Sequence, residues 1–110
     1  MGIQIAHIVL SARFEDSIAP KTCLAFRKLL PLKAKLVQAR WSGEAGWVPL
    51  DQMDLQLVYE NHTSHPTPGQ TLLYAGGLSQ PEILIPYGGC TFSSKVGQPA
   101  GNHLATIGRA

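Results

Sequence analysis

The side chains best suited to chemistry lie in one block of eight residues, RWSGEAGW, from Arg40 to Trp47. The block contains both tryptophans of a chain in which only 15% of the residues are charged. An arginine offers a planar fork that binds carboxylates and carbonyls. A tryptophan ring is large and apolar and suits the wall of a pocket. We therefore predict a pocket for a small carboxylate- or carbonyl-bearing ligand, with Arg40 as its anchor and Trp41 and Trp47 as its walls.

The same block admits a second interpretation. Along a strand, Arg40 and Ser42 would face one way and Trp41 the other. In the alternative, the two tryptophan rings fill one end of the fold and Arg40 forms an internal ion pair with Glu44. The residue types do not decide between a binding site and a packed interior.

Further polar groups complete the predicted site. His103 follows Gly101 and Asn102 at the start of the last predicted strand, where we expect the rim of a pocket. Glu44, Tyr87 and His103 would supply polar or proton-transfer groups. The predicted ligand-binding residues are Arg40, Trp41, Ser42, Glu44, Trp47, Tyr87 and His103.

No metal or cofactor is predicted. His62 and His65 have a spacing that binds metals on a helix, but their Thr, Ser and Pro neighbours indicate an irregular loop. Ser42 lies in no G-x-S-x-G motif, and Gly76-Gly77 lacks the lysine of a phosphate-binding loop. The sequence therefore identifies no catalytic residue and leaves open whether the protein is an enzyme.

Length and charge exclude several classes of protein. A chain of 110 residues predicts a single domain, residues 1–110. Its nine basic and seven acidic residues are spread along the chain, so we expect no nucleic-acid partner. No apolar stretch approaches the roughly 20 residues of a membrane span. Cys23 and Cys90 fit no metal or redox motif, and the first residues do not resemble a signal peptide. We expect free thiols and a cytoplasmic protein.

Short apolar segments separated by glycine and proline predict a mainly β fold. One helix is predicted at 20–30, between Pro20 at its start and Pro31 after its end. We predict an all-β, closed barrel of seven or eight strands with this one helix. The strands are expected at 3–10, 13–17, 35–41, 46–50, 71–75, 82–86, 91–95 and 103–107, with a strand or extended loop at 51–59, a loop at 61–69 and a bend at 88–89.

Several motifs resemble known proteins. A-P-K-T-x-x-x-F, here residues 19–26, resembles the first-helix signature of the cyclophilins. Glu60-Asn61 followed by His65 and Pro68-Gly69 is similar to the stretch before a cyclophilin core strand. The resemblance implies a closed barrel of about eight strands whose helix plugs one end.

A closer resemblance covers nearly the whole chain. An uncharacterised bacterial family of minimal cyclophilin-like domains shares A-R-W-S-G-E-x-x-W-x-P, here residues 39–49. It also shares Y-x-G-G and E-I-L-x-x-Y-G, here residues 74–77 and 82–88, and K-V-G-x-x-A-G-N-H, here residues 95–103. The chain thus resembles a family whose activity is unknown.

The resemblance to cyclophilins implies an alternative function. Cyclophilins rotate X-Pro bonds, whose uncatalysed barrier is about 18–20 kcal/mol, and use an arginine that hydrogen-bonds the prolyl nitrogen. Arg40 falls close to the position of that arginine. The alternatives to small-molecule binding are thus a prolyl isomerase or proline-peptide binder, and a structural subunit without catalysis. We also expect a homo-oligomer, because small barrels often associate through apolar patches or edge strands.

Overall fold

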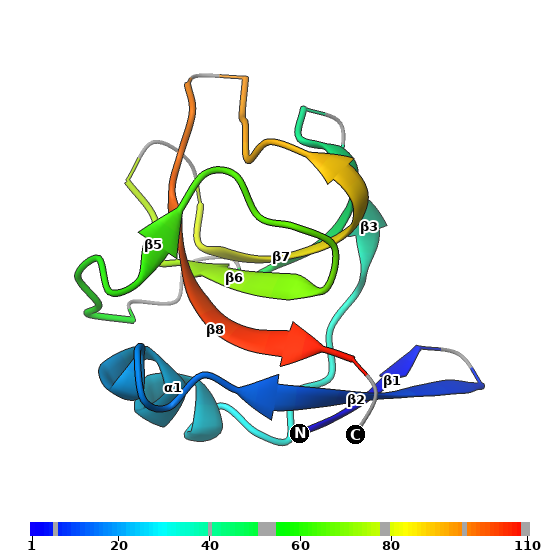
Figure 1. The fold of residues 1–110 in the computed structure, drawn as a ribbon, viewed down its shortest axis with the longest axis vertical. Helices are drawn as coiled ribbons and strands as arrows, with labels where there is room; N and C mark the ends of the chain where they lie inside the picture. The colour runs from blue at the N-terminus through cyan, green and yellow to red at the C-terminus, as the bar shows by residue number, and fades with distance from the viewer. Residues whose placement is uncertain (6, 40, 51–54, 78–79, 96, 109–110) are drawn as a thin grey trace.

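The computed structural model describes residues 1–5, 7–39, 41–50, 55–77, 80–95 and 97–108. Within these residues the chain forms one helix and eight strands (Figure 1). The helix is α1 (Pro20–Arg27), and the strands are β1 (Gly2–Ile5), β2 (Ile8–Phe14), β3 (Val37–Gln38), β4 (Gly43–Pro49), β5 (His62–Thr63), β6 (Gln70–Tyr74), β7 (Glu82–Cys90) and β8 (Gly101–Ile107).

The strands form one strongly curled antiparallel sheet in the order β1-β2-β8-β6-β7-β4-β3, with β5 paired to β8. The prediction of an all-β fold with about eight strands and one helix is confirmed. The prediction that the barrel closes is wrong, because β1 and β3 stand at opposite ends of this order and no described residues pair them. Of the described residues in the predicted strand 35–41, two form β3, which leaves little edge with which to close the sheet.

The N-terminal strand predicted at 3–10 is in fact a hairpin. The chain reverses between Ile5 and Ile8, which pair directly, and Ile3 pairs with Leu10. Both arms are apolar, so their sequence reads like one continuous strand. The hairpin extends beyond the other strands (Figure 1), and only Ala12–Phe14 of β2 pairs with β8.

Helix α1 begins at Pro20 and buries Thr22, Cys23 and Phe26. It ends at Arg27, three residues before the predicted end. Residues 28–29 form a turn ahead of Pro31. Ala19 precedes the helix and provides no side-chain cap. The free N–H groups of the first turn must therefore find acceptors elsewhere.

Glu60 provides those acceptors from a distant loop. Its Oε1 accepts hydrogen bonds from the backbone N–H and the hydroxyl of Thr22, both 2.8 Å, and its Oε2 accepts one from the Lys21 N–H at 3.3 Å. Asn102 holds this loop in place, because its amide accepts from the Glu60 N–H and donates to Thr22 Oγ1 and Val58 O. Helix, loop and β8 are thereby joined by one polar network.

The sheet packs apolar side chains on both faces, because neighbouring residues of a strand point to opposite sides. Leu73 and Ile83 belong to the cluster that α1 covers with Cys23 and Phe26. The cluster on the opposite face contains Ala45, Leu72, Tyr74, Leu84 and Phe92.

The remaining elements differ from the prediction mainly at their ends. β4 begins at Gly43 rather than Gly46, and β7 continues through Gly88 and Gly89 to Cys90 where we expected a bend. The expected strand 91–95 is absent from the described residues, and the short β2 extension to Phe14 replaces a separate strand at 13–17. Residues 55–59 form no regular structure, the expected loop 61–69 contains β5, and residues 51–54 lie outside the described part.

Candidate functional site

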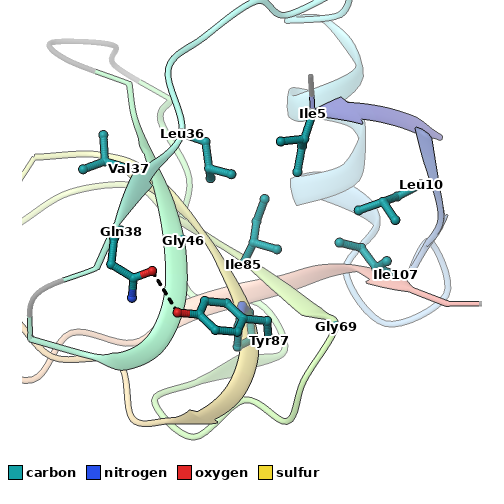
Figure 2. Close-up of a pocket in the computed structure, with 11 residues that line it drawn as sticks. Ile5, Leu10, Leu36, Val37, Gln38, Gly46, Gly69, Ile85, Tyr87 and Ile107 are labelled. Atoms are coloured by element: carbon teal, nitrogen blue, oxygen red, sulfur yellow. Dashed lines mark hydrogen bonds between the residues drawn. The ribbon is translucent and has the colours of Figure 1, made fainter. Parts of the chain in front are cut away.

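A groove of about 410 Å³ lies at the opening of the half-barrel, between the N-terminal hairpin and the β3–β4 edge (Figure 2). Ile5 and Leu10 come from the hairpin, Leu36 from the segment before β3, and Ile85 from β7. The full lining is Ile5, Leu10, Leu36, Val37, Gln38, Gly46, Gly69, Ile85, Pro86, Tyr87 and Ile107.

The polar part of this groove is the pair formed by Tyr87 and Gln38. The Tyr87 hydroxyl donates a hydrogen bond of 2.8 Å to Gln38 Oε1, as Figure 2 shows. Gln38 Nε2 lies 3.4 Å from the carbonyl oxygens of Ala39 and Gly43, which are long contacts. Both side chains are exposed, so at one end of an apolar groove a ligand oxygen can reach an amide N–H, and also the phenolic O–H if it replaces Gln38 Oε1 as the acceptor.

Strand periodicity places these groups. Along β7, Ile83, Ile85 and Tyr87 occupy alternate positions and therefore share a face. On β4, Gly46 leaves room for Leu36: a Cβ at residue 46 would lie 2.9 Å from Leu36 Cδ1. The glycine thus lets an apolar side chain from the neighbouring segment form a wall of the groove.

The two tryptophans predicted as pocket walls lie outside this groove. Trp47 is half-buried and packs against the cluster of Ala45, Leu72, Tyr74, Leu84 and Phe92, and it does not line the groove. Trp41 is 55% exposed and is likewise not a lining residue. Arg40 lies outside the described residues. Neither tryptophan therefore belongs to this groove, and their role in binding stays a prediction.

Ser42 and Glu44 hold the chain around the end of β7. The buried Ser42 Oγ donates to Ser93 O at 3.0 Å and accepts from Ser93 N–H at 2.9 Å. Glu44 Oε1 accepts from the Gly89 N–H at 3.0 Å. These bonds give both residues a structural role beside the binding role predicted for them.

His103 belongs to a different polar chain. Its Nε2 lies 2.9 Å from Thr106 Oγ1, which donates 3.0 Å to Glu15 Oε1. Burial alone would raise the pKa of Glu15, but hydrogen bonds from Arg13 and Thr106 outweigh it and hold that pKa below its ordinary value. The imidazole is half-buried and does not line the groove. Of the six predicted site residues that the structure describes, Tyr87 lines the groove and the other five do not.

Sequence reasoning missed one unusual carboxyl. Glu82, at the first position of β7, is only 9% exposed, and burial raises its pKa to about 7. Among the described residues, no hydrogen bond or ion pair to the Glu82 carboxylate is found. Its place at the head of the apolar run EILIP was the available signal, because a carboxylate there is forced into the sheet.

The cysteines are free thiols, as predicted. Cys23 is buried and its Sγ donates to Leu104 O at 3.2 Å, and burial raises the pKa of this thiol to about 11. Cys90 is half-buried, and burial raises its pKa as well. Within the described ranges, no three His, Cys, Asp or Glu side chains come together to hold a metal ion.

None of the helical structure in the described residues is long and apolar enough to cross a membrane. Among curated proteins, no sequence matches this chain. One family model does match, and it extends over residues 1–110. An all-β half-barrel and a match over this whole range agree with the expectation of an uncharacterised family. The chain belongs to the family described as protein of unknown function (DUF3830).

Proposed function

We propose that the protein binds a small, mainly apolar ligand bearing a carboxylate or carbonyl in the groove at the opening of the half-barrel. The observation that carries this proposal is the apolar groove of about 410 Å³ with the Tyr87–Gln38 pair in its lining. Ligand pockets typically measure about 300–1,000 Å³ and combine apolar walls with a few polar groups. The apolar walls would cover the ligand body, and the Tyr87 hydroxyl and Gln38 amide would bind its oxygen.

Arg40 keeps its predicted role in this proposal. It follows Gln38 by two positions in the chain, and a guanidinium would add charge to the recognition of a carboxylate. Two variants separate the contributions: Tyr87→Phe removes the hydroxyl alone, and Arg40→Ala removes the charge.

Octanoate is a suitable probe, since it joins an unbranched apolar chain to one carboxylate. We expect calorimetric titration to detect its binding and Tyr87→Phe to weaken it about three- to tenfold, the effect of one lost hydrogen bond. Tyr59→Phe is the matched control, because Tyr59 is as exposed as Tyr87, 61% against 60%, but lies outside the groove. Octylamine, which has the same chain and the opposite charge, should bind less tightly than octanoate.

An affinity for octanoate that is unchanged in both Tyr87→Phe and Arg40→Ala would refute this assignment. Equal losses in Tyr87→Phe and Tyr59→Phe would also refute it, since they would place the effect outside the groove.

The prolyl isomerase alternative depends on Arg40 and on the resemblance around it. A protease-coupled isomerisation assay tests it directly, and a rate equal to the uncatalysed rate would exclude it. The free thiols of Cys23 and Cys90 support the further inference that the protein works in a reducing compartment such as the cytoplasm.

A further inference from the structure

A second pocket of about 170 Å³, here called the inner pocket, lies between β1, α1 and the sheet face that α1 covers. It shares Ile5, Leu36 and Ile85 with the groove, and Figure 2 shows these three side chains pointing toward one another. Its lining is Met1, Gly2, Ile3, Gln4, Ile5, Phe26, Leu30, Leu32, Ala34, Leu36, Val48, Thr71, Ile83 and Ile85. Almost every side chain in this lining is apolar.

Thr71 is a buried polar exception. It is 3% exposed, and its hydroxyl has no hydrogen-bond partner among the described residues. Phe26, Val48, Ile83 and Ile85 line the same pocket and offer no side-chain polar atoms. A buried hydroxyl without a partner destabilises a fold. A valine of the same shape at position 71 would therefore make the unliganded protein more stable.

The side chains around this hydroxyl are poor partners for it, because apart from Gln4 the other side chains that line the pocket are apolar. A mainly apolar molecule with one hydrogen-bonding group suits these walls. An engineered apolar cavity of about 150 Å³ in another protein holds benzene, so the inner pocket has room for one six-membered ring.

We propose that the inner pocket is a second binding site, for a small neutral molecule with one apolar ring and one hydroxyl or carbonyl, and that Thr71 is its hydrogen-bonding anchor. Thr71 lines the pocket, and a rotation of about 120° about its Cα–Cβ bond moves the hydroxyl to the position of the methyl group without moving the backbone. The unsatisfied hydroxyl of the free protein gains its partner when the ligand binds.

Phenol and toluene form a matched pair of probes, since they differ only by a hydroxyl in place of a methyl group. Binding can be followed by nuclear magnetic resonance of the side chains. Shifts of Phe26 and Val48 report the inner pocket, whereas shifts of Leu10 and Tyr87 report the groove, because each pair lines only one of the two.

We expect phenol to shift the signals of Phe26 and Val48. Thr71→Val should weaken phenol binding about three- to tenfold, the effect of one hydrogen bond, and should leave toluene binding equal or stronger. Thr71→Ser keeps the hydroxyl and should retain the advantage of phenol over toluene. Tyr87→Phe, which alters only the groove, should leave phenol binding unchanged.

Three results would overturn the inference: no phenol-dependent shift at Phe26 and Val48, an equal loss of phenol and toluene in Thr71→Val, or an unchanged affinity for phenol in that variant. The inference does not rest on ligand binding in the groove. Octanoate binding that fails while phenol shifts Phe26 refutes the groove alone, and the opposite pattern refutes the inner pocket alone.

Discussion

Thr71 is a residue whose buried hydroxyl lacks a partner, and its stability cost can be measured without any ligand. In the free protein, Thr71→Val removes the unsatisfied oxygen and preserves the shape of the side chain. We expect the free energy of unfolding to rise by about 1 kcal/mol, since an unpaired buried polar group costs about 1–3 kcal/mol. Urea denaturation of both proteins provides the measurement.

Thr106→Val is the control for that substitution. The Thr106 hydroxyl lies 2.9 Å from His103 Nε2 and donates to Glu15, so its removal should lower the free energy of unfolding by about 1 kcal/mol. Equal destabilisation in the two variants would show that the hydroxyl of Thr71 has a partner after all.

Glu82 predicts a dependence of stability on pH. Its pKa in the folded protein is about 7, above the ordinary value of 4.5, so the folded state holds this proton more tightly than the unfolded state. The resulting stabilisation is complete below pH 4.5 and is lost as the pH rises through about 7. At about 1.4 kcal/mol per pKa unit, the loss amounts to at most about 3.5 kcal/mol.

Glu82→Gln, which stays neutral, should remove this loss. We expect the variant to exceed the wild type in stability at about pH 8 and to match it at about pH 4. Denaturation curves at the two pH values test this, and a variant that keeps the pH slope of the wild type would contradict the assignment to Glu82.

The candidate site could be predicted from the sequence only in part. Tyr87 was identified and lines the groove, but Gln38, Leu10 and Leu36 were not, because ordinary apolar and amide residues become a site only when separate segments meet. Trp47 attracted attention by its residue type, yet strand alternation turns it to the face opposite Gly46, and the sequence does not reveal which face borders the groove.

At the level of elements, α1 has no N-cap side chain, and the carboxylate of Glu60 accepts the hydrogen bonds from its first turn instead. Glu60→Gln removes the charge at a helix N-terminus and replaces one acceptor oxygen with an amide donor, so we expect a loss of about 1 kcal/mol in the free energy of unfolding. Urea denaturation near neutral pH tests this.

The pH dependence of that loss provides the control. Burial would raise the pKa of Glu60, but the hydrogen bonds from Thr22 and Lys21 outweigh it and lower this pKa below 4.5. The carboxylate therefore stabilises the fold above pH 4.5, and this contribution disappears as the pH falls through the lowered pKa. A difference between Glu60→Gln and wild type that persists in strong acid would contradict a charge effect.

The local sequence predicted which segments form the helix and most of the strands, but it did not predict where these elements end or how the strands pair. Pro20 marked the start of α1 correctly, since a proline fits a first turn. The reversal between Ile5 and Ile8 carries no glycine or proline, so no local signal separated a hairpin from one long strand. The two glycines expected to bend the chain at 88–89 lie within β7, where its pairing with β4 shifts register between Gly43↔Cys90 and Ala45↔Pro86.

For the whole molecule, the open end of the sheet bears on self-association. Residues 2–12, which contain β1 and most of β2, include no Asp, Glu, Lys, Arg or Pro, the residues that usually protect an edge strand from pairing with another chain. Ile8 and Val9 are exposed near the tip of this hairpin, at 51% and 72%. We therefore expect the homo-oligomer predicted from the sequence to form through this hairpin.

Sedimentation of wild type and Val9→Lys tests this expectation, and the lysine should shift the protein toward a smaller species. Val58→Lys is the matched control, since Val58 is similarly exposed, at 74%, but lies outside the hairpin. A monomeric wild type, or the same shift in both variants, would contradict it.

Within the described residues, the hairpin is joined to the rest of the sheet by the pairing of Ala12–Phe14 with β8 and by a hydrogen bond of 3.2 Å from the Gly108 N–H to Ser11 O. It provides walls for both the groove and the inner pocket. It can therefore detach by a local fluctuation that leaves the β6–β7–β4 pairing intact. Amide protons of β1 should then exchange with deuterium faster than those of β6. The rate at which the hairpin detaches would then limit the association and dissociation rates of a ligand, independently of its affinity.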